Sequence, residues 1–224
     1  MPVEAITIPI PGAGSVSGLW QAPAKPMAGL VLAHGAGAGM THKAMAATAD
    51  GLEGLGVATL RYQFPYMERG GKRVDPPPVA HAAVRAAVVE AYRRAGDLPL
   101  YAGGRSFGGR MTSQAQALAP LDGVRGLVFF AFPLHPAGKP SDERATHLSG
   151  VLIPMLFLQG TNDALADVGL LRGTVERLGR LATLELVADA DHSFHVPART
   201  GRKDAEVLAD ILRTAAAWMS TAAT

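Results

Sequence analysis

The segment "YAGGRSFGGRMTSQAQAL", residues 101–118, places Ser106 between two pairs of glycines, with an apolar run before them and a run of helical periodicity after them. Glycine lacks a Cβ atom and permits positive φ, so glycines gather where the backbone turns sharply or another segment comes close. If the first run is a strand and the second a helix, Ser106 lies at the tip of the turn between them. Residues 104–108 then fit G-x-S-x-G, a strained turn that lifts the serine hydroxyl clear of a sheet.

Apolar and amphipathic runs alternate along the rest of the chain, with turn residues between them. This alternation predicts an α/β fold with a mostly parallel sheet of about eight strands between two helical layers, a three-layer α/β/α sandwich. The expected strands cover residues 6–10, 16–21, 29–35, 57–64, 98–104, 124–132, 154–160 and 182–188. Five to six helices are expected, among them 79–95, about 167–178 and about 203–219.

Local signals set several of these boundaries. The turn "PGAG" at residues 11–14 predicts a hairpin between the first two strands. Thr41 is expected to cap a helix that buries Met45 and its neighbours. The prolines at 76–78 suit the first turn of the next helix, and Gly96 suits its end.

Length and composition indicate one globular domain, residues 1–224, with 48% hydrophobic residues to cover a buried sheet. The formal net charge is only +2, although the pI is 9.1, and the basic residues are scattered. This distribution argues against a nucleic-acid partner. The chain has no cysteine, which excludes disulfides, thiolate metal sites and a cysteine nucleophile.

The first residues, "MPVEAITIPI", have an early glutamate and no basic start, so they do not predict a signal peptide. No run approaches the roughly 20 apolar residues of a membrane span. We therefore expect a cytoplasmic protein with no membrane association. The sequence leaves the oligomeric state open.

A serine hydroxyl becomes a nucleophile when a histidine takes its proton and a carboxylate orients that histidine. In a fold with this turn, the chain order is Ser, acid, His. Asp163 follows the strand "PMLFLQG", and His192 follows the last strand, so both are expected at the same sheet edge as Ser106. Asp167, which suits a helix cap, and His195, further from the strand end, are weaker candidates.

A metal site is the alternative for this region. Asp189, Asp191, His192 and His195 combine carboxylates with two histidines three residues apart, a set that suits a divalent ion. No second ligand cluster is evident elsewhere in the sequence, so we predict no metal and no cofactor.

The loop "HGAGAGMTH", residues 34–42, follows the third strand. A glycine-rich loop there offers backbone N–H groups to a developing oxyanion, and we expect Ala36 to supply one donor and Phe107, after the serine, the other. His34 is expected to shape the loop. A dinucleotide site is disfavoured because Met40 stands where the third glycine of G-x-G-x-x-G belongs, and the next strand ends without an acid.

The loop "QFPYMERGGKRVDPPP", residues 63–78, follows the fourth strand. Either it is a polar connection, or Arg69, Lys72 and Arg73, together with Arg105, bind an anionic group of the substrate. The sequence does not decide between these interpretations.

The motifs "LAHGAGAGM", "FPYMERGGKRVDPP" and "GGRSFGGR", with the acid and histidine in this order, resemble the α/β-hydrolase superfamily over nearly the whole chain, in a small branch close to the dienelactone hydrolases. The resemblance implies Ser106 as nucleophile, Asp163 as orienting acid, His192 as general base and acid, and Ala36 and Phe107 as oxyanion donors. Dienelactone hydrolases proper use cysteine, which this chain lacks, so their substrate is not transferred.

The residues between the strands ending near 132 and starting near 154 leave no room for a separate lid domain. The sequence thus predicts a compact, esterase-like serine hydrolase that acts on a small-molecule acyl substrate, an ester, a thioester or a related bond. A non-catalytic interaction or scaffold protein with the same fold is the alternative.

Overall fold

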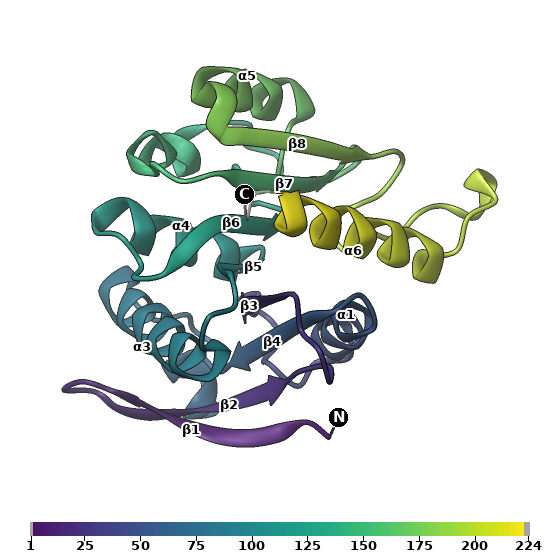
Figure 1. Cartoon of the computed structure of the whole chain (residues 1–224). Coiled ribbons are helices and arrows are strands. Elements are labelled where there is room, and N and C mark those ends of the chain that lie inside the picture. The colour runs from purple at the N-terminus through teal and green to yellow at the C-terminus, as the bar shows by residue number, and fades with distance from the viewer. Residues whose placement is uncertain (1, 222–224) are drawn as a thin grey trace.

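The computed structural model describes residues 2–221 and, within them, an eight-stranded sheet with helices on both faces (Figure 1). The strand order is β1-β2-β4-β3-β5-β6-β7-β8. β1 and β2 form an antiparallel hairpin, β2 is antiparallel to β4, and the remaining neighbours are parallel. The strands are β1 Glu4–Ile10, β2 Gly14–Gln21, β3 Ala28–Ala33, β4 Val57–Tyr62, β5 Leu100–Arg105, β6 Val124–Phe130, β7 Met155–Gly160 and β8 Ala182–Val187.

The helices are α1 Lys43–Gly54, α2 Pro65–Glu68, α3 Pro77–Ala95, α4 Phe107–Leu118, α5 Val168–Leu178 and α6 Asp204–Thr221, with 3₁₀ helices η1 Glu143–Gly150, η2 Gly179–Leu181 and η3 Ala198–Thr200. Helices α1 and α6 cover one face of the sheet, and α3, α4, η1 and α5 cover the other (Figure 1). None of the described helices combines the length and hydropathy that crossing a bilayer requires.

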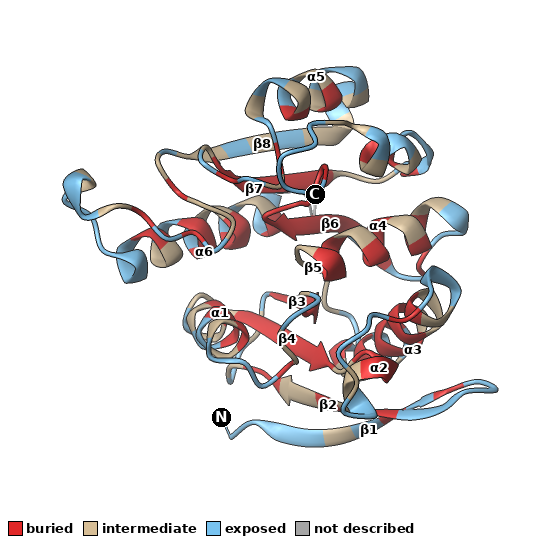
Figure 2. Ribbon diagram, turned by 180° about the vertical axis from the view of Figure 1, so that it is seen from behind, coloured by how far each residue is buried: buried red, intermediate tan, exposed pale blue. Residues whose placement is uncertain are grey.

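The central strands are buried on both faces, as Figure 2 shows in red. Every residue of β3, β4 and β7 is buried. Along the edge strands β1 and β8, exposed residues alternate with buried or partly buried ones. Along β7, Met155 and Phe157 belong to the core on the face that α3, α4, η1 and α5 cover, and Leu156 and Leu158 belong to the core on the face that α1 and α6 cover. This two-sided burial explains why the central strands read as continuous apolar runs.

The predicted α/β/α architecture with a mostly parallel eight-stranded sheet is confirmed. The expected hairpin, the proline start of α3 and the end of α3 at Gly96, with φ of 59°, are also present. Within the described chain, residues 131–154 between β6 and β7 hold only η1 and loops, so there is no lid domain there.

Three expected strands, 29–35, 57–64 and 124–132, end two residues earlier in the structure, and one predicted helix cap was wrong. The N-cap of α1 is His42 and not Thr41, because the His42 ring nitrogen Nδ1 accepts a hydrogen bond from the Ala44 backbone N–H at 3.2 Å. Two short helices, α2 and η1, lie in segments that the sequence analysis treated as loops.

Candidate active site

Ser106 is the single residue between the end of β5 and the start of α4. Its φ and ψ are 50° and −116°, a positive φ that is rare outside glycine and marks a strained turn. A Cβ at Gly108 would lie 2.6 Å from the carbonyl oxygens of Ala33 and His34, and one at Gly104 would overlap Ala33. The flanking glycines therefore let the turn close against β3, as the motif predicts.

The structure brings Ser106, His192 and Asp163 together from three separate loops. The His192 ring nitrogen Nε2 lies 2.8 Å from Ser106 Oγ, and its Nδ1 lies 2.7 Å from Asp163 Oδ2. The Asp163 side chain is fully buried and the His192 side chain is 25% exposed. With Nδ1–H donating to the carboxylate, Nε2 is left as the acceptor for the serine proton.

Asp163 is held by two further donors. Its Oδ1 accepts from the Leu165 backbone N–H at 2.8 Å, and its Oδ2 accepts from the Gln159 side-chain amide as well as from His192. Gln159 lies on β7 and is itself fully buried. Three donors fix the orientation of a carboxylate that no water reaches, so the carboxylate can orient His192 in turn.

The loop that carries His192 is built by its neighbours. Asp191 Oδ1 accepts from the backbone N–H groups of Ser193 and His195, at 2.7 and 3.0 Å, which closes a tight turn after His192. Arg105 Nη2 donates to the His192 carbonyl at 3.2 Å. These contacts fix the backbone that carries the imidazole beside Ser106.

The side chains considered above as a possible metal site form separate contacts with other residues. Asp189 pairs with Arg199 at 3.1 Å, and His195 pairs with Asp204 at 2.8 Å, an exposed contact that raises the pKa of His195. Over residues 2–221, no group of three or more histidine or carboxylate side chains is arranged to hold a metal. His195 is turned toward α6 and Asp167 caps α5, its Oδ1 accepting from Leu170 N at 2.9 Å, so neither takes part in the Ser106 contact.

The β3–α1 loop is anchored from beneath by His34, which is fully buried. His34 Nε2 accepts from the Phe64 N–H at 3.0 Å, and Nδ1–H donates to the Gly35 carbonyl at 2.7 Å. Burial lowers the pKa of His34, against the opposing effect of the Gly35 carbonyl, so the ring is neutral with both nitrogens engaged. Because the Gly35–Ala36 peptide is trans, the Ala36 N–H points away from His34.

Tyr66, on α2, holds the same loop from the other side. Its hydroxyl donates to the Ala36 carbonyl at 2.8 Å, and its N–H donates to buried Asp75 at 2.7 Å. Burial, reinforced by the Asp75 charge, raises the pKa of Tyr66 to about 12, so the hydroxyl stays a donor. Two donors, His34 and Tyr66, thus fix the peptides on either side of Ala36.

An open cavity of about 500 Å³ lies beside Ser106 and His192. Its wall comes from the β3–α1 loop, the start of α1, the turn at residues 104–108 (the elbow) and the His192 loop: Gly35, Ala36, Gly37, Ala38, His42, Lys43, Ala44, Met45, Arg105, Ser106, His192 and Ser193. A substrate in this cavity reaches the serine hydroxyl directly.

Of the four basic residues proposed to bind an anion, the structure places Arg105 in the cavity wall and the other three elsewhere. Arg69 forms an ion pair with Asp75 at 2.8 Å, and Lys72 and Arg73 are exposed in the loop before α3. The loop at 69–73 therefore supports Tyr66 through Asp75 and does not line the cavity at Ser106.

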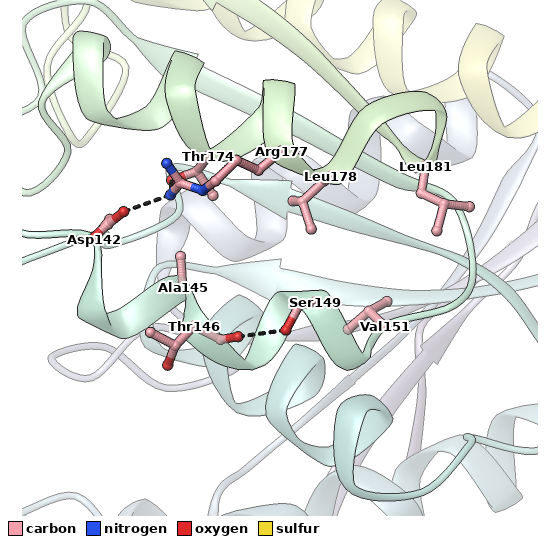
Figure 3. A pocket seen from close by; sticks show the side chains of 9 residues that line it. All are labelled: Asp142, Ala145, Thr146, Ser149, Val151, Thr174, Arg177, Leu178 and Leu181. Carbon is pink, nitrogen blue, oxygen red and sulfur yellow. Dashed lines mark hydrogen bonds and ion pairs between the residues drawn. The ribbon is translucent and has the colours of Figure 1, made fainter.

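A second cavity, of about 460 Å³, lies between η1 and α5. Figure 3 shows its lining, with Arg177 of α5 reaching the Asp142 carboxylate that precedes η1. Neither Ser106 nor His192 lines it. The hydroxyls of its Thr146, Ser149 and Thr174 donate to helix carbonyls, and no histidine is among its described lining residues. A second serine–histidine contact, Ser113 Oγ to His147 Nε2 at 2.7 Å, is made by a serine with no exposed surface.

A model of the alpha/beta hydrolase domain matches residues 26–220. The chain belongs to the α/β-hydrolase family. This match covers the elbow, the acid and histidine loops and the β3–α1 loop in one alignment. The family assignment therefore rests on the same segments that form the site.

Solved α/β-hydrolase structures share the fold. An α/β serine hydrolase without a lid from Xanthomonas campestris is 22% identical with a TM-score of 0.75, covering 97% of this chain and 96% of its own. An α/β serine hydrolase homologue from Coxiella burnetii is 20% identical with a TM-score of 0.76, covering 96% and 98%. A dienelactone hydrolase from Anabaena variabilis is 19% identical with a TM-score of 0.77, covering 97% and 96%.

The sequence analysis did not identify Gln159, Tyr66, His42 or Lys43 as parts of the site. Gln159 could have been identified from the sequence, because a polar residue in the apolar strand "MLFLQG" needs a buried hydrogen-bond partner. Tyr66 could not have been identified, because its role depends on how the loop at 63–76 folds back over the β3–α1 loop.

Proposed function

We propose that the protein is a serine hydrolase that cleaves an ester, a thioester or a related acyl bond through an acyl-enzyme on Ser106. The observation that carries this proposal is the continuous hydrogen-bonded chain from Ser106 Oγ through the His192 ring to buried Asp163. Ser106 lies at a strained strand-to-helix turn and faces an open cavity, which supports the same conclusion.

In the proposed first step, Ser106 Oγ attacks the acyl carbon while His192 Nε2 takes the hydroxyl proton. Asp163 keeps the Nδ1–H tautomer and stabilises the imidazolium that forms. The proton then passes from Nε2 to the leaving oxygen or sulfur. In the second step His192 deprotonates a water, which releases the acid and restores Ser106.

The developing oxyanion needs donors that are fixed before reaction. We assign this role to the N–H groups of Ala36 and Phe107. The first N–H of α4 belongs to Phe107 and has no partner within the helix. His34 and Tyr66 fix the peptides around Ala36, which supports the second assignment. The mechanism needs no cofactor.

The test is turnover of a neutral 4-nitrophenyl ester and of an acyl thioester by the wild type and by Ser106→Ala. Ser106→Ala is expected to lower kcat by about three orders of magnitude or more with little change in thermal unfolding. Ser113→Ala, which removes the hydroxyl of the buried serine–histidine contact, is the matched control and keeps most of the activity. Turnover that survives in Ser106→Ala contradicts the proposal and places the chemistry on another residue. A wild type without any turnover contradicts it and favours a scaffold role.

A further inference from the structure

The wall of the cavity beside Ser106 is unbalanced in charge. Two permanent cations, Lys43 and Arg105, line it, and none of its described lining residues is aspartate or glutamate. Asp163 is fully buried behind His192 and already accepts from three donors. Asp191, in the His192 loop, accepts from two backbone N–H groups and is not among the residues that line the cavity. A ligand in this cavity therefore meets positive charge.

Most N–H donors of the Arg105 guanidinium have no hydrogen-bond acceptor among the described residues. Its side chain passes under the His192 loop, where Nη2 donates to the His192 carbonyl and the guanidinium carbon lies 6.0 Å from the centre of the Phe194 ring. A guanidinium carries five N–H donors, and this carbonyl is its sole hydrogen-bond acceptor within residues 2–221. Asp191 and Asp163 act on it through space, and no described carboxylate forms an ion pair with it.

Lys43 is the first residue of α1 and is exposed at the cavity rim, with no ion pair among the described residues. Beside it, His42 Nδ1 accepts from the Ala44 N–H, so the neutral ring carries its proton on Nε2. The rim thus offers N–H donors and a positive charge where α1 begins.

We propose that the substrate of this site is an ester that carries a carboxylate, which Arg105 and Lys43 bind while Ser106 attacks the ester carbonyl. This inference rests on the proposed function. The carboxylate itself does not react. The bond from Ser106 Oγ to the acyl carbon forms, the ester C–O bond breaks, and the serine proton leaves with the alcohol through His192. Water then releases the acid.

The experiment compares esters that differ in one charge. Mono-4-nitrophenyl adipate carries the carboxylate on its acyl part, and methyl 4-nitrophenyl adipate is its neutral match. 4-Acetoxybenzoate carries the carboxylate on its leaving group, and methyl 4-acetoxybenzoate is neutral. In at least one pair the anionic ester is expected to have a kcat/KM about tenfold higher, since a charge-assisted contact contributes at least this much. The pair that shows the preference identifies the charged part of the substrate.

The preference is expected to fall several-fold in Lys43→Met and in Arg105→Met, and to shrink as salt is raised. Arg105→Met also loses the bond to the His192 carbonyl, so its rate with both esters drops, and the ratio between the esters is the informative quantity. Lys25→Met, a lysine exposed before β3 and outside the cavity wall, is the matched control and keeps the ratio. Lys43 is exposed, so its variant tests the idea even if Arg105→Met does not fold.

A ratio near one in both pairs, or a ratio unchanged in Lys43→Met, overturns the inference. The neutral esters test the proposed function separately. If they are hydrolysed through Ser106 and the charge preference is missing, only the substrate class is wrong. If none of the four esters is hydrolysed, or if their hydrolysis persists in Ser106→Ala, the proposed function itself fails.

Discussion

Replacing Asp163 by asparagine changes one atom and removes one charge at a carboxylate with three donors. Oδ1 faces the Leu165 N–H, and Oδ2 faces His192 Nδ1 and the Gln159 amide. If the asparagine oxygen takes the Oδ2 place, its NH₂ group faces the Leu165 N–H, and a buried donor loses its partner. Such a loss costs about 1–3 kcal/mol.

In the opposite orientation the neighbours adapt. Gln159 Oε1 is buried and has no partner in the described structure, so a turned Gln159 amide accepts from the new NH₂ group. His192 then accepts at Nδ1 and carries its proton on Nε2. The number of unpaired buried groups is then the same as in the wild type, because the Gln159 NH₂ group takes the place where Oε1 had no partner. However, Nε2 no longer accepts the Ser106 proton. The stable form of Asp163→Asn therefore has the wrong histidine tautomer.

We expect Asp163→Asn to lower kcat for a neutral ester by about 10³–10⁴-fold, the magnitude that loss of the correct tautomer produces in serine hydrolases. Stability should fall by only about 1 kcal/mol, which is about 2–4 °C in Tm for a chain of this size. Kinetics and thermal unfolding measure both, and ¹⁵N NMR of the His192 ring reports the tautomer. Asp167→Asn is the matched control, because asparagine caps α5 as well as aspartate does. A kcat of Asp163→Asn within about tenfold of wild type would refute the reasoning.

Three other changes test separate parts of the structure. Tyr66→Phe removes the hydroxyl that holds the oxyanion loop and should lower kcat about tenfold with little change in KM, and an unchanged kcat would show that the loop does not need this contact. Gly108→Ala should give insoluble or strongly destabilised protein because its Cβ meets two carbonyl oxygens. Gly54→Ala, with open space at the end of α1, should raise the free energy of unfolding by about 0.5 kcal/mol. Equal denaturation midpoints of these two variants would count against this packing. EDTA should leave ester turnover unchanged, and a loss that added zinc restores would point to a metal-dependent reaction.

The order of strands and helices was predictable because burial on both faces makes the central strands apolar and glycine and proline mark the turns. The α1 cap was not, because histidine is an uncommon N-cap and His42 competes with Thr41, a more usual one. Helices α2 and η1 lack an apolar repeat long enough to detect, since they span only Pro65–Glu68 and Glu143–Gly150.

For the site, the sequence supplied residues whose positions follow from strand ends. Ser106, Asp163 and His192 each lie just past the carboxyl end of a parallel strand, so the topology alone brings their loops to one edge. The direction of a loop side chain has no such rule. Arg69 turns to Asp75 instead of the cavity, while Lys43 enters the wall because α1 begins beside the elbow.

The most direct test of the central claim is covalent labelling with a fluorophosphonate, followed by intact mass and peptide mapping. The wild type and His195→Ala should gain one adduct on Ser106, and His192→Ala should label more slowly by orders of magnitude, because only His192 contacts the serine hydroxyl among the described histidines of this loop. No adduct on the wild type, an adduct on another residue, or equal labelling of the two histidine variants would contradict Ser106 as a nucleophile activated by His192.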